Sequence, residues 1–195
     1  MSSAPIFAYA RLLWALGLAL LFCGCTGVAF KAPVGTPMSA SEMADLKGEW
    51  IANDDEDGAH TVRVEQKPGS DRLIAKWSEE GKDKHADLCV TKIGEHVQLV
   101  WVDDEDEAVG LLFPFRICRY SKDAVAFLSP DDEEVKKLAN AGKLVAGLDK
   151  KNNNWIVSKG DLEALLESKE FWQLGGCFIL TRSTAVSGAG PNVKP

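Results

Sequence analysis

The chain has 195 residues, of which 22 are basic and 29 are acidic, and its formal net charge is −7. This acidic balance argues against nucleic acid as a partner and against electrostatic attraction to anionic lipid. The length suits a single domain with a sizeable hydrophobic core.

The first 24 residues have the layout of a secretory signal. Arg11 is followed by an apolar run that carries no charge as far as residue 30, and a positive end before an apolar block is typical of such signals. Residues 20–22 are Leu, Leu and Phe, and Gly24 directly precedes Cys25. This stretch resembles the lipobox of bacterial lipoproteins. The resemblance implies cleavage before Cys25 and acylation of that residue.

Acylation of Cys25 would hold the protein at a membrane in the bacterial cell envelope, outside the cytosol. Thr26, and not Asp, follows the cysteine. In a diderm bacterium this resembles the signal for the periplasmic side of the outer membrane. Two alternatives remain open. The apolar run is close to the roughly 20 residues that a spanning helix needs, so the leader could be an uncleaved anchor, or the protein could be an ordinary secreted one.

Composition divides the rest of the chain into three parts. Residues 31–41, KAPVGTPMSAS, are rich in Pro, Gly, Ser and Ala, so we expect residues 25–41 to form a linker from the acylated cysteine. Residues 183–195 have a similar composition and predict a disordered tail. Residues 42–182 are therefore predicted to form one domain.

Most of this domain alternates apolar and polar residues with a period of two, which predicts β-strands. In HTVRVEQ, for example, Val62 and Val64 share one face. Many short antiparallel strands that begin and end one domain favour a closed barrel or sandwich. Further runs with this pattern are RLIAKWS (72–78), ADLCVTKI (86–93), HVQLVWV (96–102), LLFPFRICRY (111–120), AVAFLSP (124–130) and GGCFILTR (175–182).

Two short helices are predicted within the strand region. The first follows Ser129 and Pro130, which suit a cap and a first helical position, and it ends before Gly142. The second follows Ser158 and Asp161, which together resemble a capping box. Between the two helices, KLVAGLDKKNNNWIV (143–157) predicts a hairpin with an Asn-rich turn.

Gly48, Trp50 and Arg182 carry a resemblance to the lipocalin or calycin family. Gly48 and Trp50 form a Gly-x-Trp motif on the first predicted strand, and Arg182 stands near the end of the last strand. The resemblance implies that the Trp50 indole packs near the Arg182 guanidinium and closes one end of a barrel, a contact favoured by cation–π attraction. The predicted fold is therefore mainly β, a lipocalin-like up-and-down antiparallel barrel or strongly curved sheet with two short helices.

Aromatic residues on the predicted strands are the candidates for ligand binding. Trp77, Trp101 and His60 all stand on strand faces with apolar neighbours. Such residues usually belong to a core, but several that face one cavity could line a pocket for a small apolar ligand. The sequence leaves these two interpretations open.

No motif in the chain predicts catalysis or a cofactor. Asp55 and Asp57 in NDDEDG fit part of a calcium loop, but the position of the last ligand holds Val64, so they are weak metal candidates. The second acidic run, DDEDE (103–107), resembles a solvated turn. His60, His85 and His96 have no metal-ligand spacing. We therefore expect no metal, no cofactor and no enzyme activity.

Three cysteines remain after Cys25, namely Cys89, Cys118 and Cys177. Outside the cytosol they could form one disulfide in any of three pairings, and the sequence does not choose among them.

The sequence predicts a lipid-anchored extracytoplasmic domain that binds a small hydrophobic ligand or a protein partner, or that serves as a scaffold. The alternatives are an envelope hydrolase or metal-dependent enzyme using His and carboxylates at a barrel mouth, and a purely structural lipoprotein. The binding domain and the purely structural lipoprotein differ in whether the barrel interior is hollow or filled.

Overall fold

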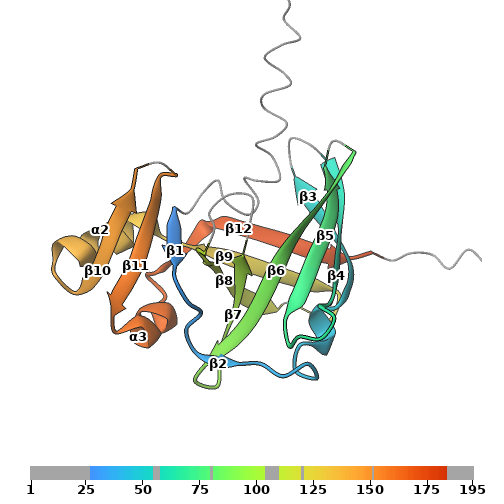
Figure 1. Cartoon of the computed structure of the whole chain (residues 1–195), viewed down its shortest axis with the longest axis horizontal. Helices are drawn as coiled ribbons and strands as arrows, with labels where there is room; N and C mark the ends of the chain where they lie inside the picture. The colour runs from blue at the N-terminus through green and yellow to red at the C-terminus, as the bar shows by residue number, and fades with distance from the viewer. Residues whose placement is uncertain are drawn as a thin grey trace, which may run out of the picture.

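Eight antiparallel strands form a closed barrel (Figure 1). The computed structural model describes residues 27–54, 58–79, 81–103, 110–119, 121–150 and 152–183. Each barrel strand pairs with the next along the chain, β12 returns to β3, and pairing between β6 and β7 completes the ring. The predicted mainly-β up-and-down barrel is confirmed. Its strands are β3 (Gly48–Asp54), β4 (Gly58–Gln66), β5 (Leu73–Glu79), β6 (Lys82–Ile93), β7 (Val97–Asp103), β8 (Phe113–Arg119), β9 (Ala124–Pro130) and β12 (Trp172–Arg182).

Between β9 and β12 the chain leaves the barrel and builds a second layer. This excursion consists of α2 (Asp132–Asn140), β10 (Leu144–Asp149), β11 (Asn154–Gly160) and α3 (Leu162–Glu167). The predicted hairpin is confirmed, because β10 and β11 pair antiparallel. The layer shares a second hydrophobic core with outward-facing side chains of β6 and β7, among them Ile93, Leu99 and Trp101.

The β7 strand is consequently buried on both faces. Val100 and Val102 point into the barrel and belong to its interior core, whereas Leu99 and Trp101 point outward into the second core. This arrangement follows from the period of two along a strand, which sends neighbouring side chains to opposite faces. Both faces of this part of the wall are therefore apolar.

The N-terminal part of the described chain differs from the expected linker. β1 (Val28–Phe30) is almost fully buried, pairs in parallel with β11, and exchanges two backbone hydrogen bonds with Leu112. β2 (Thr36–Pro37) pairs with β6. Val28 and Phe30 are buried in the second core and Ala29 in the barrel core, as expected for a strand whose successive side chains point to opposite faces. Residues 28–30 and 36–37 of the expected linker are therefore part of the folded body.

The two predicted helices are present, but both begin later than expected. Asp131 caps α2 by accepting hydrogen bonds from the backbone N–H groups of Glu133 and Glu134. Asp161 caps α3 by accepting from Ala164. Ser129 and Pro130 belong to β9, and Ser158 belongs to β11. Within the described residues, neither of these helices nor any other is long and apolar enough to cross a membrane.

Cys25, with the rest of the predicted leader, lies outside the described residues, as do residues 184–195 of the predicted tail.

Candidate functional site

One end of the barrel is closed by the residues of the Gly-x-Trp motif and Arg182. The Arg182 guanidinium carbon lies 4.5 Å from the centre of the Trp50 ring. The same guanidinium donates hydrogen bonds to the backbone carbonyl oxygens of Asp45, Lys47 and Lys122. It therefore ties the last barrel strand to the first strand, to the β8–β9 turn and to the short helix η1 (Ala44–Leu46).

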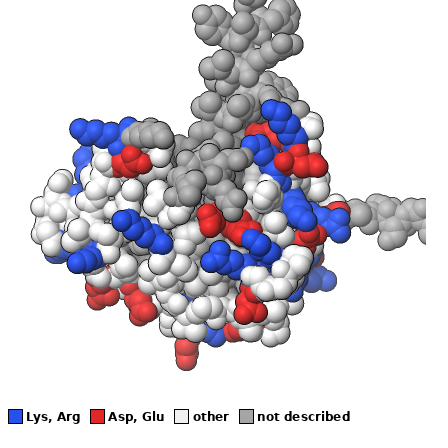
Figure 2. Space-filling model, viewed as in Figure 1, with Lys and Arg blue, Asp and Glu red and all other residues white. Residues whose placement is uncertain are grey.

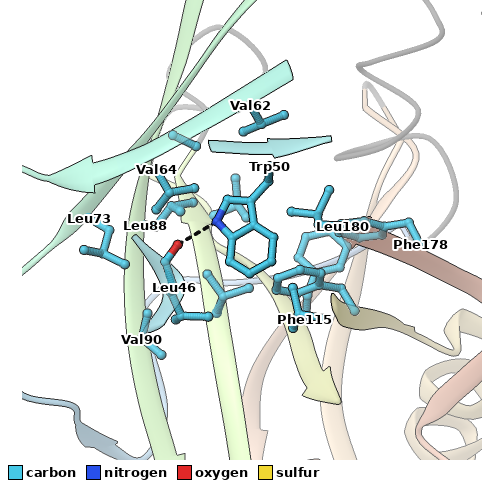
Figure 3. A pocket seen from close by; sticks show the side chains of 15 residues that line it. Leu46, Trp50, Val62, Val64, Leu73, Leu88, Val90, Phe115, Phe178 and Leu180 are labelled. Atoms are coloured by element: carbon cyan, nitrogen blue, oxygen red, sulfur yellow. Dashed lines mark hydrogen bonds between the residues drawn. The ribbon is translucent and has the colours of Figure 1, made fainter. Parts of the chain in front are cut away.

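The indole of Trp50 forms the floor of the interior. Its ring is 3% exposed, and its Nε1 donates a hydrogen bond of 2.8 Å to the carbonyl oxygen of Leu46 in η1 (Figure 3). This bond satisfies the polar atom of an otherwise apolar side chain. The indole can therefore present an apolar surface to the interior without leaving its N–H group unpaired.

Gly48 permits the close approach of Arg182. Its φ angle is 132°, a backbone conformation that residues with a side chain rarely adopt, and an added Cβ would lie 2.7 Å from Nη1 of Arg182. Both observations require glycine at this position. The structure thus brings together Gly48, Trp50 and Arg182, the three residues that the sequence analysis grouped on a resemblance.

The interior of the barrel holds a cavity of about 50 Å³ that is lined by apolar side chains alone (Figure 3). Its floor is Leu46 and Trp50, and aliphatic and aromatic side chains from the other seven barrel strands form its wall. The full lining is Leu46, Trp50, Val62, Val64, Leu73, Ala75, Leu88, Val90, Val100, Val102, Phe115, Val125, Phe127, Phe178 and Leu180.

The size of the cavity limits what it can hold. An engineered apolar cavity of about 150 Å³ stays dry and binds benzene, and drug-sized ligands need about 300–1,000 Å³. A cavity of about 50 Å³ is therefore too small for either without movement of its wall. Because none of the lining side chains other than Trp50 carries a polar atom, a water molecule inside would lack the partners that it needs.

Phe178 differs from the rest of the lining in its exposure. It is half-buried, whereas the other lining side chains are buried. Its ring stacks on Phe127 at 4.9 Å and meets the edge of Phe115 at 5.5 Å. Phe178 thus extends from the cavity to the molecular surface. These three phenylalanines were missed as site residues, although the alternation in LLFPFRICRY, AVAFLSP and GGCFILTR places Phe115, Phe127 and Phe178 on inward faces.

The predicted ligand-binding residues are not gathered around this cavity. Trp77 is half-buried and packs against the interior core, but it lines a surface depression on β5 and β6 together with Lys84 and His85. His60 is half-buried opposite Ala52 on β3. Neither residue belongs to the cavity lining.

Trp101 does not face the barrel interior, contrary to the interpretation that it could line a pocket there. Its ring is fully buried in the second core, where it meets the edge of Phe30 at 5.3 Å. Its Nε1 donates to Oγ1 of Thr91. Trp101 is therefore a packing residue between the barrel and the second layer.

The histidines do not form the site that the enzyme interpretation needs. His60 stands on β4 near the end of the barrel opposite Arg182, whereas His96 lies in the β6–β7 turn at the same end as Arg182. No three His, Cys, Asp or Glu residues of the described part of the chain lie close enough to hold a metal ion. Asp55 and Asp57 lie outside the described residues.

Cys89, Cys118 and Cys177 are all free thiols, so none of the three disulfide pairings left open by the sequence is formed. Cys89 and Cys118 are half-buried and Cys177 is exposed. Burial raises the pKa of the Cys89 thiol, which disfavours the reactive thiolate.

No family model, curated protein or solved structure matches this chain. The resemblance to lipocalins and to lipoproteins therefore stays a prediction from the sequence.

Proposed function

We propose that this protein is a lipid-anchored, lipocalin-like binding domain of the bacterial cell envelope, attached to the membrane through acylated Cys25, which binds the end of a slender apolar ligand inside its barrel. The observation that supports this function is the interior cavity, which is closed at one end by Trp50 and lined by apolar side chains alone. Such a lining favours a hydrocarbon segment over a polar head group, because it offers no hydrogen-bond partner.

The cavity costs stability when it is empty. At about 24 cal/mol per Å³, an empty space of this volume destabilises the fold by about 1 kcal/mol. Each methylene group of a ligand that is transferred from water into the cavity stabilises the complex by about 0.8 kcal/mol. A ligand that inserts the last few carbon atoms of a chain therefore replaces an unfavourable void by favourable contacts.

A longer inserted segment needs movement of Phe178. This ring reaches the surface, and its displacement from Phe127 and Phe115 would enlarge the cavity and open it to solvent. We propose that Phe178 controls access to the interior.

A purely structural lipoprotein is the second candidate, and the small volume of the cavity favours it. A filled barrel would act as a rigid support for the second layer. The two candidates differ in whether a hydrocarbon probe enters the interior and reaches Trp50.

The experiment uses 12-bromododecanoic acid, whose terminal bromine quenches indole fluorescence at short range. Binding in the barrel predicts saturable quenching that is reduced by Ala75→Val, because Ala75 lines the cavity and the larger side chain occupies it. Ala86→Val is the matched control, since Ala86 is a buried interior alanine outside the cavity lining. Absence of saturable quenching in the unchanged protein, together with stabilisation by Ala75→Val, would instead support the structural role.

A further inference from the structure

Gly27, two residues after the predicted acylation site, belongs to the folded body. Gly27 is already fixed, because its carbonyl oxygen accepts a hydrogen bond from the backbone N–H of Trp155. An added Cβ on Gly27 would lie 2.7 Å from the carbonyl oxygen of Asn153. The start of β1 is thus attached to the beginning of β11 and to the β10–β11 turn, beside which β1 lies in Figure 1.

This short connection limits the distance between the body and the membrane. Consecutive Cα atoms are about 3.8 Å apart, so the Cα atom of Cys25 lies within about 8 Å of the Cα atom of Gly27. Acyl chains on Cys25 enter the bilayer directly from that residue. The surface around Gly27 must therefore lie at the lipid head groups.

The surface beside Gly27 is the hairpin tip, which we define as Leu148, Lys150, Asn152 and Trp155. Leu148 pairs directly with Trp155 across the hairpin, so both side chains lie on one face of the sheet. Leu148 is 42% exposed, which is high for a large apolar residue, and Trp155 is half-buried, with part of its side chain packed against the second core. Lys150 and Asn152 are polar and border this apolar pair.

These side chains match the chemistry of a membrane interface. Tryptophan is enriched at the level of the head groups, and lysine can bury its stem while its ammonium group stays in water. The area at the left of Figure 2 is mainly uncharged, with charged side chains around its border.

We propose that the hairpin tip rests on the phospholipid surface and fixes the orientation of the domain on the membrane. This inference rests on the anchor at Cys25 that is part of the proposed function. A flexible linker of the kind expected from residues 25–41 would let the body rotate freely. β1 removes that freedom, because its buried residues join the anchor directly to β11.

The test uses the full acylated protein in phosphatidylcholine vesicles whose acyl chains carry bromine. Bromine quenches only the indoles that reach the bilayer, and Trp50, Trp101 and Trp172 are buried in the protein. We expect partial quenching of the fluorescence, and we expect Trp155→Phe to abolish it. Trp77→Phe, which removes the other half-buried indole, should leave the quenching unchanged.

A second pair of variants tests the contact between Trp155 and the bilayer by changing the neighbouring Leu148. Leu148→Asp should reduce the quenching of Trp155 at least twofold, because a carboxylate opposes insertion next to that ring. Val145→Asp is the matched control: Val145 is 57% exposed on the same strand but pairs with Lys159, away from the tip. It should leave the quenching as it is in the unchanged protein.

Flotation of the same vesicles distinguishes failure of the docking of the hairpin tip from failure of the anchor at Cys25. Protein that floats with the vesicles but shows no bromine quenching would overturn the docking of the hairpin tip and leave the anchor in place. Protein that does not float would overturn the anchor, and with it both the proposed function and this inference.

Discussion

Arg182 stacks on Trp50 with its guanidinium carbon 4.5 Å from the ring centre, and this contact joins the last strand of the barrel to the first. The two residues are far apart in the chain but lie directly opposite each other in the β3–β12 register. The contact closes one end of the barrel and holds Trp50 as the floor of the cavity. The proposed binding of a ligand therefore depends on this closed end.

Replacing Arg182 by alanine should destabilise the fold. The change removes the cation–π contact and three charge-assisted hydrogen bonds to carbonyl oxygens, and we expect a loss of about 2–3 kcal/mol in the free energy of unfolding. Urea denaturation measures this loss. Arg119→Ala is the control, because the exposed ion pair of Arg119 with Asp45 contributes about 0–1 kcal/mol. Equal effects of the two variants would show that Arg182 has no special part in closing the barrel.

Gly48→Ala should also destabilise the fold, for two reasons that a control can separate. The backbone at Gly48 has a φ of 132°, and the new methyl group would meet Arg182; we expect a cost of about 1–3 kcal/mol. Gly69 has a φ of 71° but no heavy atom within 4 Å of an added Cβ. Gly69→Ala therefore reports the milder cost of a left-handed backbone without any contact of the new methyl group. A Gly48→Ala variant no less stable than Gly69→Ala would contradict the close approach of Arg182.

Phe178→Ala should enlarge the cavity and speed the uptake of 12-bromododecanoic acid. The removed ring fills space between the interior and the surface, so the probe should reach Trp50 faster and with higher affinity. Stopped-flow quenching of tryptophan fluorescence measures the rate. Ile179→Ala provides the comparison, because the neighbouring side chain points outward and is 48% exposed. If both variants take up the probe at the same rate as the unchanged protein, Phe178 does not control access.

Glu42 should make stability depend on pH in the acid range. The hydrogen bond from Lys92, followed by those from the backbone and hydroxyl of Ser39, lowers the pKa of Glu42 from its ordinary value of 4.5 to about 2. Because the folded state lowers this pKa, the contribution of Glu42 to stability is present above pH 4.5 and is lost as the pH falls from 4.5 to 2.

An NMR titration of the Glu42 carboxyl group checks this expectation. Lys92→Met should raise the Glu42 pKa, whereas Lys136→Met, which removes a lysine paired with Glu133 on α2, should leave the Glu42 titration unchanged. A Glu42 carboxyl group that titrates near 4.5 in the unchanged protein would be inconsistent with the contacts to Lys92 and Ser39.

Much of the barrel could be predicted from local patterns. Val62 and Val64 on β4, and Leu73 and Ala75 on β5, alternate with polar residues and all face the interior core. Their period of two is enough to identify the strands and their inward faces. The Gly48 and Trp50 motif could be related to Arg182 only through a family resemblance, because no local pattern joins residues so far apart.

Other features depend on tertiary contacts that a local pattern does not contain. Both faces of β7 are apolar, so alternation alone could not distinguish the interior Val100 from Trp101, which packs under the second layer. Likewise, Val28–Phe30 continues the apolar composition of the leader, and its burial becomes evident only when β11 lies beside it. The cavity volume depends on how all the interior side chains pack, which the sequence does not reveal.

Intact-mass spectrometry of the protein extracted from its native membrane tests the central claim most directly. A lipid-anchored binding domain predicts a chain that begins at Cys25 and carries the added mass of acyl chains. A chain that retains residues 1–24, or one that begins elsewhere and carries no acyl mass, would contradict the proposed anchor.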